Sequence, residues 1–225
     1  MYTKRNFYLA IILLLGISLP LMPYAIMLDP AGHTQQTGRR LWGSFERAET
    51  FKCAETLKDS LEKYSSSTRV ILTRAPGQVL VPLQNASFAN RLNVDFFVRI
   101  HCVKADTEKP HITVYYQEID PLIDNAQHAE MPHAFIPLHH AHFRSIHRSS
   151  DSAKALKKFL SSAEHQKDFD CYGTTHGLPL AALMGITVPA IVIEIGLCSD
   201  DQWKLFIEPL TQGLSSTLNL TNGQS

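Results

Sequence analysis

The chain of 225 residues is 44% hydrophobic, which is enough for one domain with a substantial core and too little for two large domains. Its 21 basic residues balance its 21 acidic residues, and leaving out Lys4 and Arg5, which we assign to a targeting segment, gives a slight acidic excess. This balance argues against a polyphosphate-binding surface, so we expect no nucleic acid among the partners.

The first residues of the chain have the features of a signal peptide, which we place at residues 1–18. Lys4 and Arg5 provide a positively charged start, and residues 7–15 (FYLAIILLL) form a short apolar stretch. Small residues then follow at the positions that a signal peptidase inspects. We therefore expect export to the periplasm or cell envelope.

The apolar run does not stop at the expected cleavage site, so an uncleaved anchor reaching to about residue 25 is the alternative. Two prolines interrupt the run, which argues against a long spanning helix. The membrane is a partner only if this segment stays attached. In both cases we expect one folded domain at residues 25–220, followed by a short tail at 221–225.

Within the domain, short apolar runs alternate with helical patterns. Runs that are β-branched or aromatic and mostly apolar on both faces predict strands at residues 25–28, 69–73, 95–102, 111–116 and 190–197. Apolar residues at helical spacing predict helices at about 46–64, 82–92, 151–164 and 201–218. The alternation predicts a single α/β domain with a mostly parallel mixed sheet, flanked by helices on both faces.

Four polar side chains fall where such a fold collects its ligands, at the carboxyl edge of the sheet. His33 follows the first predicted strand, His101 ends the third, Glu194 lies near the end of the last, and Glu46 opens the first helix. Imidazole and carboxylate groups suit a catalytic zinc ion, which takes three protein ligands and keeps one open position. We expect His33, Glu46 and His101 to be the ligands. Glu194 then takes a proton from a zinc-activated water and passes it to a leaving amine.

Glu194 is the most informative of the four residues. A carboxylate between Ile193 and Ile195, inside an apolar strand, is unfavourable to bury without a function. A glutamate at a helix start often only stabilises the helix dipole, so Glu46 alone is weak evidence. Glu49, one helical step further on, is the alternative ligand.

Two other groups of side chains have more than one interpretation. The four cysteines lack the spacing of a zinc knuckle, and both disulfides and buried thiols are open for Cys53, Cys102, Cys171 and Cys198. Four histidines crowd the otherwise irregular, His- and Pro-rich stretch 117–150, which we predict to pass over one end of the sheet. We favour a solvated or substrate-facing rim over a second metal site for His139, His140, His142 and His147.

The residues of the proposed zinc site also carry a family resemblance. The chain resembles the zinc-dependent N-acetylmuramoyl-L-alanine amidases of the amidase-3 type, over residues 26–218. The matching motifs, in the family's order and strand context, are LDPAGH at 28–33, GSFERAETFKCAETL at 43–57, VILTR at 70–74, DFFVRIH at 95–101 and PAIVIEIGLCSDD at 189–201.

This resemblance implies that His33, Glu46 and His101 bind zinc and that Glu194 is the catalytic acid and base. It implies hydrolysis of the amide between N-acetylmuramic acid and the L-alanine of the stem peptide in peptidoglycan, a reaction that helps daughter cells to separate. Some members carry an inserted helix that covers the zinc until an activator protein displaces it. The stretch 117–150 occupies the part of the chain where such an insert belongs.

The chain departs from the family pattern without losing a predicted ligand or Glu194. Ala31 is an extra residue before Gly32, Asn85 stands where an arginine is usual, and Val103 and Asp200 each replace an asparagine. Two other functions therefore stay open. One is a zinc peptidase that cleaves within the stem peptide, and the other is a wall-binding domain that has lost turnover.

Overall fold

The computed structural model describes residues 23–79, 83–118, 137–162, 164–173 and 177–222. The predicted signal peptide and residues 119–136 of the His- and Pro-rich stretch lie outside these ranges. Among the described residues, no helix has the length and apolar character that crossing a membrane requires.

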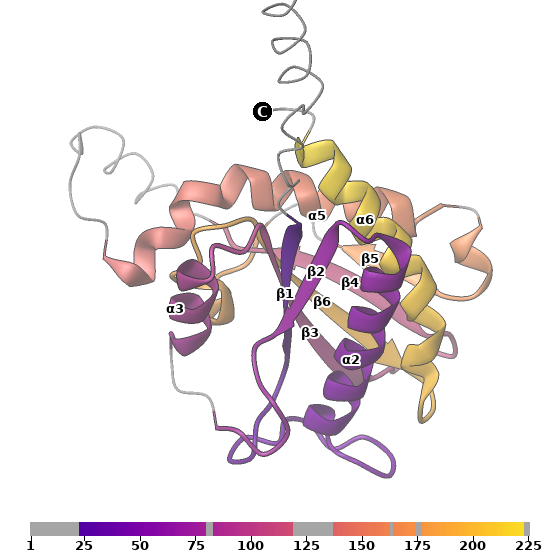
Figure 1. The fold of residues 1–225 in the computed structure, drawn as a ribbon. Helices are drawn as coiled ribbons and strands as arrows, with labels where there is room; N and C mark the ends of the chain where they lie inside the picture. The colour runs from indigo at the N-terminus through magenta and orange to yellow at the C-terminus, as the bar shows by residue number, and fades with distance from the viewer. Residues whose placement is uncertain (1–22, 80–82, 119–136, 163, 174–176, 223–225) are drawn as a thin grey trace, which may run out of the picture.

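One mixed sheet of six strands forms the centre of the domain, in the order β2-β1-β3-β6-β4-β5 (Figure 1). Strands β1, β2, β3 and β6 run parallel, whereas β4 runs antiparallel to β6 and parallel to β5. The first residue of β4 therefore lies at the edge where β3 and β6 end. The strands are β1 Tyr24–Pro30, β2 Thr68–Leu72, β3 Phe96–Lys104, β4 His111–Tyr116, β5 Asp170–Gly173 and β6 Ala190–Leu197.

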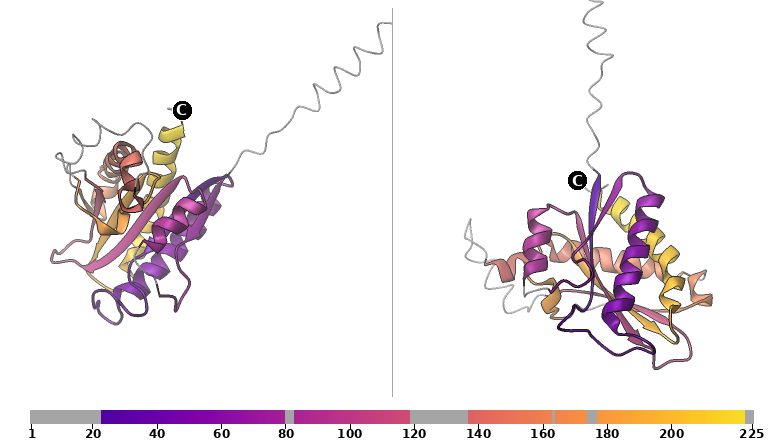
Figure 2. Two further views of the ribbon diagram at one scale, coloured as in Figure 1. Left: turned by 90° about the vertical axis from the view of Figure 1, so that its left-hand side faces the viewer. Right: turned by 60° about the horizontal axis from the view of Figure 1, so that its bottom comes forward.

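Helices cover both faces of this sheet, as predicted. They are α2 Glu46–Tyr64, α3 Gln84–Arg91, α5 Ile146–Leu160 and α6 Ile207–Asn222. Side chains of α2, α5 and α6 share one apolar core with the sheet, and side chains of α3 belong to a smaller core on the other face. In the right-hand view of Figure 2, α2 and α6 lie side by side and β1 separates them from α3.

Side chains along β3 alternate between the two cores. Ile100 and Cys102 are fully buried in the larger core, whereas Phe97 belongs to the smaller one. Because successive side chains of a strand point to opposite faces, Arg99 and His101 lie on the α3 face. Cys102 and His101 therefore lie on opposite faces of the sheet.

The five predicted strands and four predicted helices are present, but the stretch before α5 was wrongly predicted to be irregular up to residue 150. A 3-10 helix spans Leu138–Ser145, and α5 already begins at Ile146. The sequence does not indicate where α5 begins, because serines occupy buried positions of this helix, where apolar residues are expected. Ser149 Oγ donates to the Ser145 carbonyl at 2.9 Å and accepts the Ala190 N–H at 2.9 Å.

Two further differences concern short elements. The edge strand β5 has no apolar run and is held by its pairing with β4, so periodicity did not indicate it. The helix predicted to begin at residue 201 is divided into a 3-10 helix, Gln202–Phe206, and α6. Two other 3-10 turns span His165–Lys167 and Ala181–Leu183.

Candidate active site

His101 and Glu194 are neighbours in the sheet. The parallel register of β3 and β6 pairs them directly, one residue from each strand. The residues before and after Glu194, Ile193 and Ile195, are fully buried in the larger core, so the Glu194 carboxylate points to the opposite, α3 face. Its side chain is 25% exposed, which leaves it accessible to substrate.

Glu46 brings a second carboxylate to the same place from the first turn of α2. Its Oε1 lies 2.7 Å from His101 Nδ1, and its Oε2 accepts the Arg39 backbone N–H at 3.0 Å. Burial raises the pKa of Glu46, but the hydrogen bonds with His101 and Arg39 lower it more, so the pKa lies below its ordinary value. The carboxylate is therefore held in its charged form, which is the form that binds a cation.

Gly38 makes room for the Glu46 carboxylate. Gly38 has a φ of +75°, and a Cβ atom added there would stand 2.5 Å from Glu46 Oε2. A side chain at position 38 would thus be strained by the backbone and would displace the carboxylate. Glycine is required here for both reasons.

His33 is placed by the turn that follows β1. Its backbone N–H donates to the Gln36 carbonyl at 2.8 Å, and its Nδ1 accepts the Gln35 N–H at 3.3 Å. Gly32, at a φ of +80°, packs so tightly against α2 that an added Cβ would lie 2.8 Å from Arg47 Cβ. The turn therefore lies directly against the start of the helix that carries Glu46.

His33 and His101 line one cleft with a volume of about 820 Å³. Its polar wall also contains Arg99 and His139. The apolar wall lies toward α3 and consists of Val79, Leu83, Ala86, Ala181, Ala182 and Met184. The cleft is large enough for several atoms of a substrate beside the two histidines.

The donor set fits zinc in its chemistry, because imidazole nitrogen and carboxylate oxygen are both zinc ligands. Glu46 and His101 are already in contact, and His33 opens onto the same cleft as His101. Among the residues that the structure describes, no group of three His, Cys, Asp or Glu side chains is arranged as a metal site. Two of the three predicted ligands are thus brought together, and the third is in their vicinity.

A partly buried network of side chains supports His101. Arg99 Nε donates to His101 Nε2 at 3.0 Å, and Arg99 Nη1 forms an ion pair with the fully buried Asp29. Asp29 also accepts a hydrogen bond of 2.6 Å from Thr73 Oγ1. The sequence does not indicate this role of Arg99, because a long side chain has many reachable partners and only the β1–β3 register pairs Asp29 with Arg99.

Comparison with known proteins decides the family. The model of the family described as N-acetylmuramoyl-L-alanine amidase, the amidase-3 type, matches residues 26–207. The chain belongs to this family. Membership confirms the predicted amidase activity, which is hydrolysis of peptidoglycan at the bond between N-acetylmuramic acid and L-alanine. A search of curated proteins finds no match.

Solved structures agree with the amidase fold. An N-acetylmuramoyl-L-alanine amidase from Clostridium difficile 630 is 17% identical, with a TM-score of 0.61, over 88% of this chain and 98% of that chain. AmiC2 of Nostoc punctiforme is 16% identical, with a TM-score of 0.60, over 88% and 98%. The CwlD amidase from Clostridioides difficile, in complex with the GerS lipoprotein, is 14% identical, with a TM-score of 0.60, over 88% and 99%. These likenesses confirm the α/β fold of the amidase domain.

Glu49, the alternative ligand, is engaged elsewhere. Its Oε1 accepts from Ser44 Oγ at 2.7 Å and from Lys52 Nζ at 3.0 Å, and its Oε2 accepts from Trp203 Nε1 at 3.0 Å. Both oxygens thus join the start of α2 to its neighbours. The geometry favours Glu46 as the carboxylate of the active site.

Two histidines of the stretch 117–150 have different surroundings: His142 lies in the protein interior and His139 lines the cleft. His142 is buried, and burial, together with the nearby His140, lowers its pKa. His142 therefore stays neutral at pH 7 and accepts the Gly185 N–H at 3.4 Å. His139 lines the same cleft as His33, in accordance with the predicted rim.

All four cysteines are free thiols in the structure. Cys53 and Cys102 are fully buried, and burial raises the pKa of Cys53 to about 12. These two residues act as small apolar side chains in the larger core. The half-buried pair Cys171 and Cys198 is not joined by a disulfide.

Proposed function

We propose that this amidase is a zinc enzyme in which His33, Glu46 and His101 bind the ion and Glu194 transfers protons. One observation carries the proposal: His101 contacts Glu46 and is paired in the sheet with Glu194. A cation ligand and a proton acceptor are thereby fixed on adjacent strands. The family's zinc dependence, which the resemblance implies, agrees with this donor set.

Each residue has a defined part in the reaction. When bound, Zn²⁺ supplies Lewis-acid polarisation of the scissile carbonyl and of the attacking water. Glu194 accepts a proton from the water as the new C–O bond forms, and it donates that proton to the nitrogen of L-alanine as the C–N bond breaks. The products are the lactyl carboxylate of the glycan and a peptide with a free amino terminus.

The surroundings of Glu194 suit both halves of this cycle. Its side chain is partly exposed, so substrate and water can reach it, while buried isoleucines on either side fix the strand that carries it. Arg99, which is paired with Asp29, contacts His101 Nε2 while Glu46 contacts Nδ1, and the two contacts limit the orientation of the imidazole ring. The strands β3 and β6 and the Asp29–Arg99 pair thus support the proposed arrangement of these groups.

We also propose that residues 1–18 direct export and that the domain acts in the periplasm or envelope, where its peptidoglycan substrate lies. A role in cell division follows from the predicted reaction. The complex of the CwlD amidase with the GerS lipoprotein supports a protein activator as a partner.

One experiment tests the function and separates it from the alternatives. Purified protein is analysed for metal content, and muropeptides digested with it are analysed by mass spectrometry. An amidase releases intact peptides that begin with L-alanine, together with peptide-free glycan. A stem-peptide peptidase would release shortened peptides, and a wall-binding domain would release nothing; either result would contradict the proposal.

A further inference from the structure

Arg39 lies on a short hairpin between β1 and α2, beside the active site. Arg40 and Phe45 form an antiparallel bridge, and the Leu41 N–H donates to the Ser44 carbonyl at 3.0 Å, which closes the turn. One step before this bridge, the Arg39 carbonyl accepts the Glu46 N–H at 2.8 Å. With its own N–H bound to the Glu46 carboxylate, the Arg39 backbone is fixed on both sides.

The Arg39 side chain reaches from this fixed backbone to the other catalytic carboxylate. Its Nη1 lies 3.0 Å from Glu194 Oε2. Arg39 therefore contacts Glu46 through its main chain and Glu194 through its side chain. A single residue spans the proposed metal ligand and the proposed proton acceptor.

The ion pair has little to contribute to folding. The Arg39 side chain is 57% exposed, and exposed ion pairs stabilise proteins only weakly. The hairpin does not need an arginine for its shape either, since its bridge and turn use backbone groups. What the contact does is restrict the carboxylate of Glu194, which otherwise has several rotamers open to it on the exposed side of the strand.

We propose that Arg39 is a positioning residue for Glu194. This inference rests on the proposed function, because it assigns the proton transfer to Glu194. The guanidinium holds one carboxylate oxygen, Oε2, and so restricts where the other oxygen can meet water and the leaving nitrogen. Productive proton transfer needs this carboxylate within hydrogen-bond reach of both.

The contact between Arg39 and Glu194 uses one nitrogen and one oxygen. The positive charge and the length of the side chain therefore matter more than the two-pronged geometry of the guanidinium. Lysine can satisfy such a single contact, whereas it replaces arginine poorly in bidentate pairs. Arg39→Lys should therefore keep most of the function, and Arg39→Ala and Arg39→Gln should lose it. All three variants retain the backbone contacts to Glu46, so the metal ligand is unaffected.

The test measures kcat and KM on purified muropeptides, with zinc content and melting temperature for each variant. Arg39→Ala and Arg39→Gln should lower kcat about 10- to 100-fold, as expected for a misplaced catalytic group, with little change in KM. Arg39→Lys should restore kcat to within about fivefold of the wild type. Zinc content should stay unchanged, and the melting temperature should fall by less than about 3 °C.

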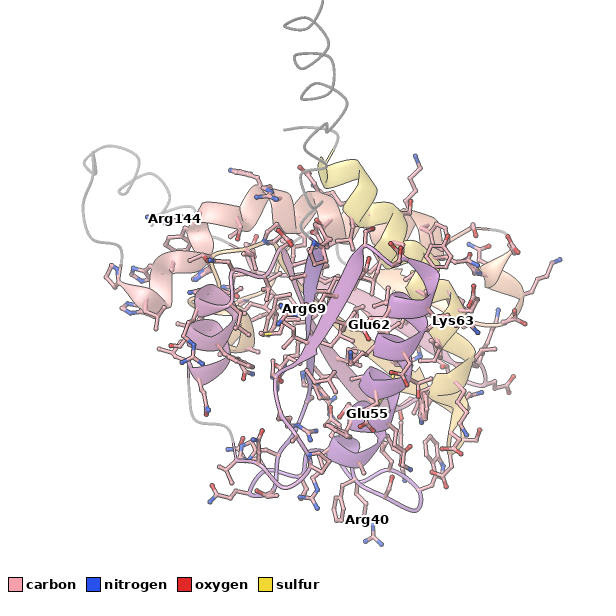
Figure 3. All side chains as sticks on the ribbon, in the orientation of Figure 1. Arg40, Glu55, Glu62, Lys63, Arg69 and Arg144 are labelled. Atoms are coloured by element: carbon pink, nitrogen blue, oxygen red, sulfur yellow. The ribbon has the colours of Figure 1, made fainter. Side chains whose placement is uncertain are left out.

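Arg40→Ala is the matched control, since Arg40 is the next arginine of the same hairpin, is exposed, and points away from the domain (Figure 3). It should leave kcat unchanged. The inference is overturned if Arg39→Ala keeps kcat within about twofold of the wild type, if lysine fails to rescue, or if Arg39→Ala loses zinc. Failure of the proposed function is a different result, in which Glu194→Gln retains full turnover.

Discussion

His101 and Glu194 stand side by side because the register of β3 and β6 pairs them residue for residue. Neighbouring strands are about 4.8 Å apart, so the sheet itself sets the spacing between a proposed zinc ligand and the proposed proton acceptor. A slip of one residue would turn Glu194 into the larger apolar core and Ile193 onto the α3 face of the sheet. The burial of Ile193 and Ile195 therefore protects the catalytic geometry.

The first prediction concerns Glu194. Glu194→Gln keeps the size of the side chain but removes its ability to accept a proton. The kcat should therefore fall by about 10²- to 10⁴-fold. Zinc content should be retained, because the residue is not one of the proposed ligands. Turnover of muropeptides and metal analysis of the same preparation measure both properties. Glu55→Gln, on the exposed surface of α2 (Figure 3), is the control and should behave like the wild type.

The second prediction separates the two competing glutamates. Glu46→Gln should abolish stoichiometric zinc binding, because it removes a charged ligand that contacts His101. Glu49→Gln should retain zinc but lower the free energy of unfolding by about 1–3 kcal/mol, since its carboxylate accepts hydrogen bonds from Ser44, Lys52 and Trp203. Zinc titration and urea unfolding give the two quantities. The reverse pattern would make Glu49 the ligand.

The third prediction uses two glycines with similar backbones. Gly38 and Gly77 have φ values of +75° and +84°, so alanine is strained at both. Only at Gly38 would the new methyl group meet the Glu46 carboxylate; at Gly77 nothing lies within 4 Å. Gly38→Ala should therefore weaken zinc binding by about 10- to 100-fold, as loss of ligand support does, while Gly77→Ala should not. Equal zinc affinities in the two variants would refute this role of Gly38.

The fourth prediction is a pH dependence of stability. Burial raises the pKa of Glu49, but hydrogen bonds from Ser44, Lys52 and Trp203 lower it more, so its folded-state pKa lies below the ordinary value of 4.5. The unfolded chain thus takes up the proton at a higher pH than the folded chain. The stabilisation by Glu49 is complete above about pH 4.5 and is lost as the pH falls through the folded-state pKa.

The stability difference between the wild type and Glu49→Gln should therefore shrink as the pH is lowered from 6 toward 3. Denaturant unfolding at several pH values measures this difference directly. A difference that stays constant over this range would show that Glu49 titrates alike in the folded and unfolded chains.

The sequence predicted those elements whose burial is visible locally. Strand β6 and helix α2 have the predicted bounds, because a strand apolar on both faces and a helix with apolar residues at regular spacing are both local patterns. The four proposed site residues were also singled out in the sequence, since His33 follows a predicted strand, His101 ends one and Glu46 opens a predicted helix. Glu194 was indicated by a charge within an apolar strand.

Other features depend on contacts that local patterns do not contain. Strand β5 exists through its pairing with β4, and the direction of β4 follows from its antiparallel partner β6. Arg39 and Arg99 gave no sequence signal, because the partners of a long side chain are set by which strands and loops lie next to each other. The structure alone joins Arg39 to Glu194 and Arg99 to Asp29.

The most direct test of the central claim is anomalous diffraction at the zinc absorption edge from crystals of the zinc-loaded protein. The proposed function predicts one zinc peak in the cleft, about 2.0–2.2 Å from a nitrogen of His33, a nitrogen of His101 and an oxygen of Glu46. Glu194 should face the peak without binding it. A zinc peak bound by His139 or Glu49 instead, or one that lacks His33 or His101, would contradict the proposed function.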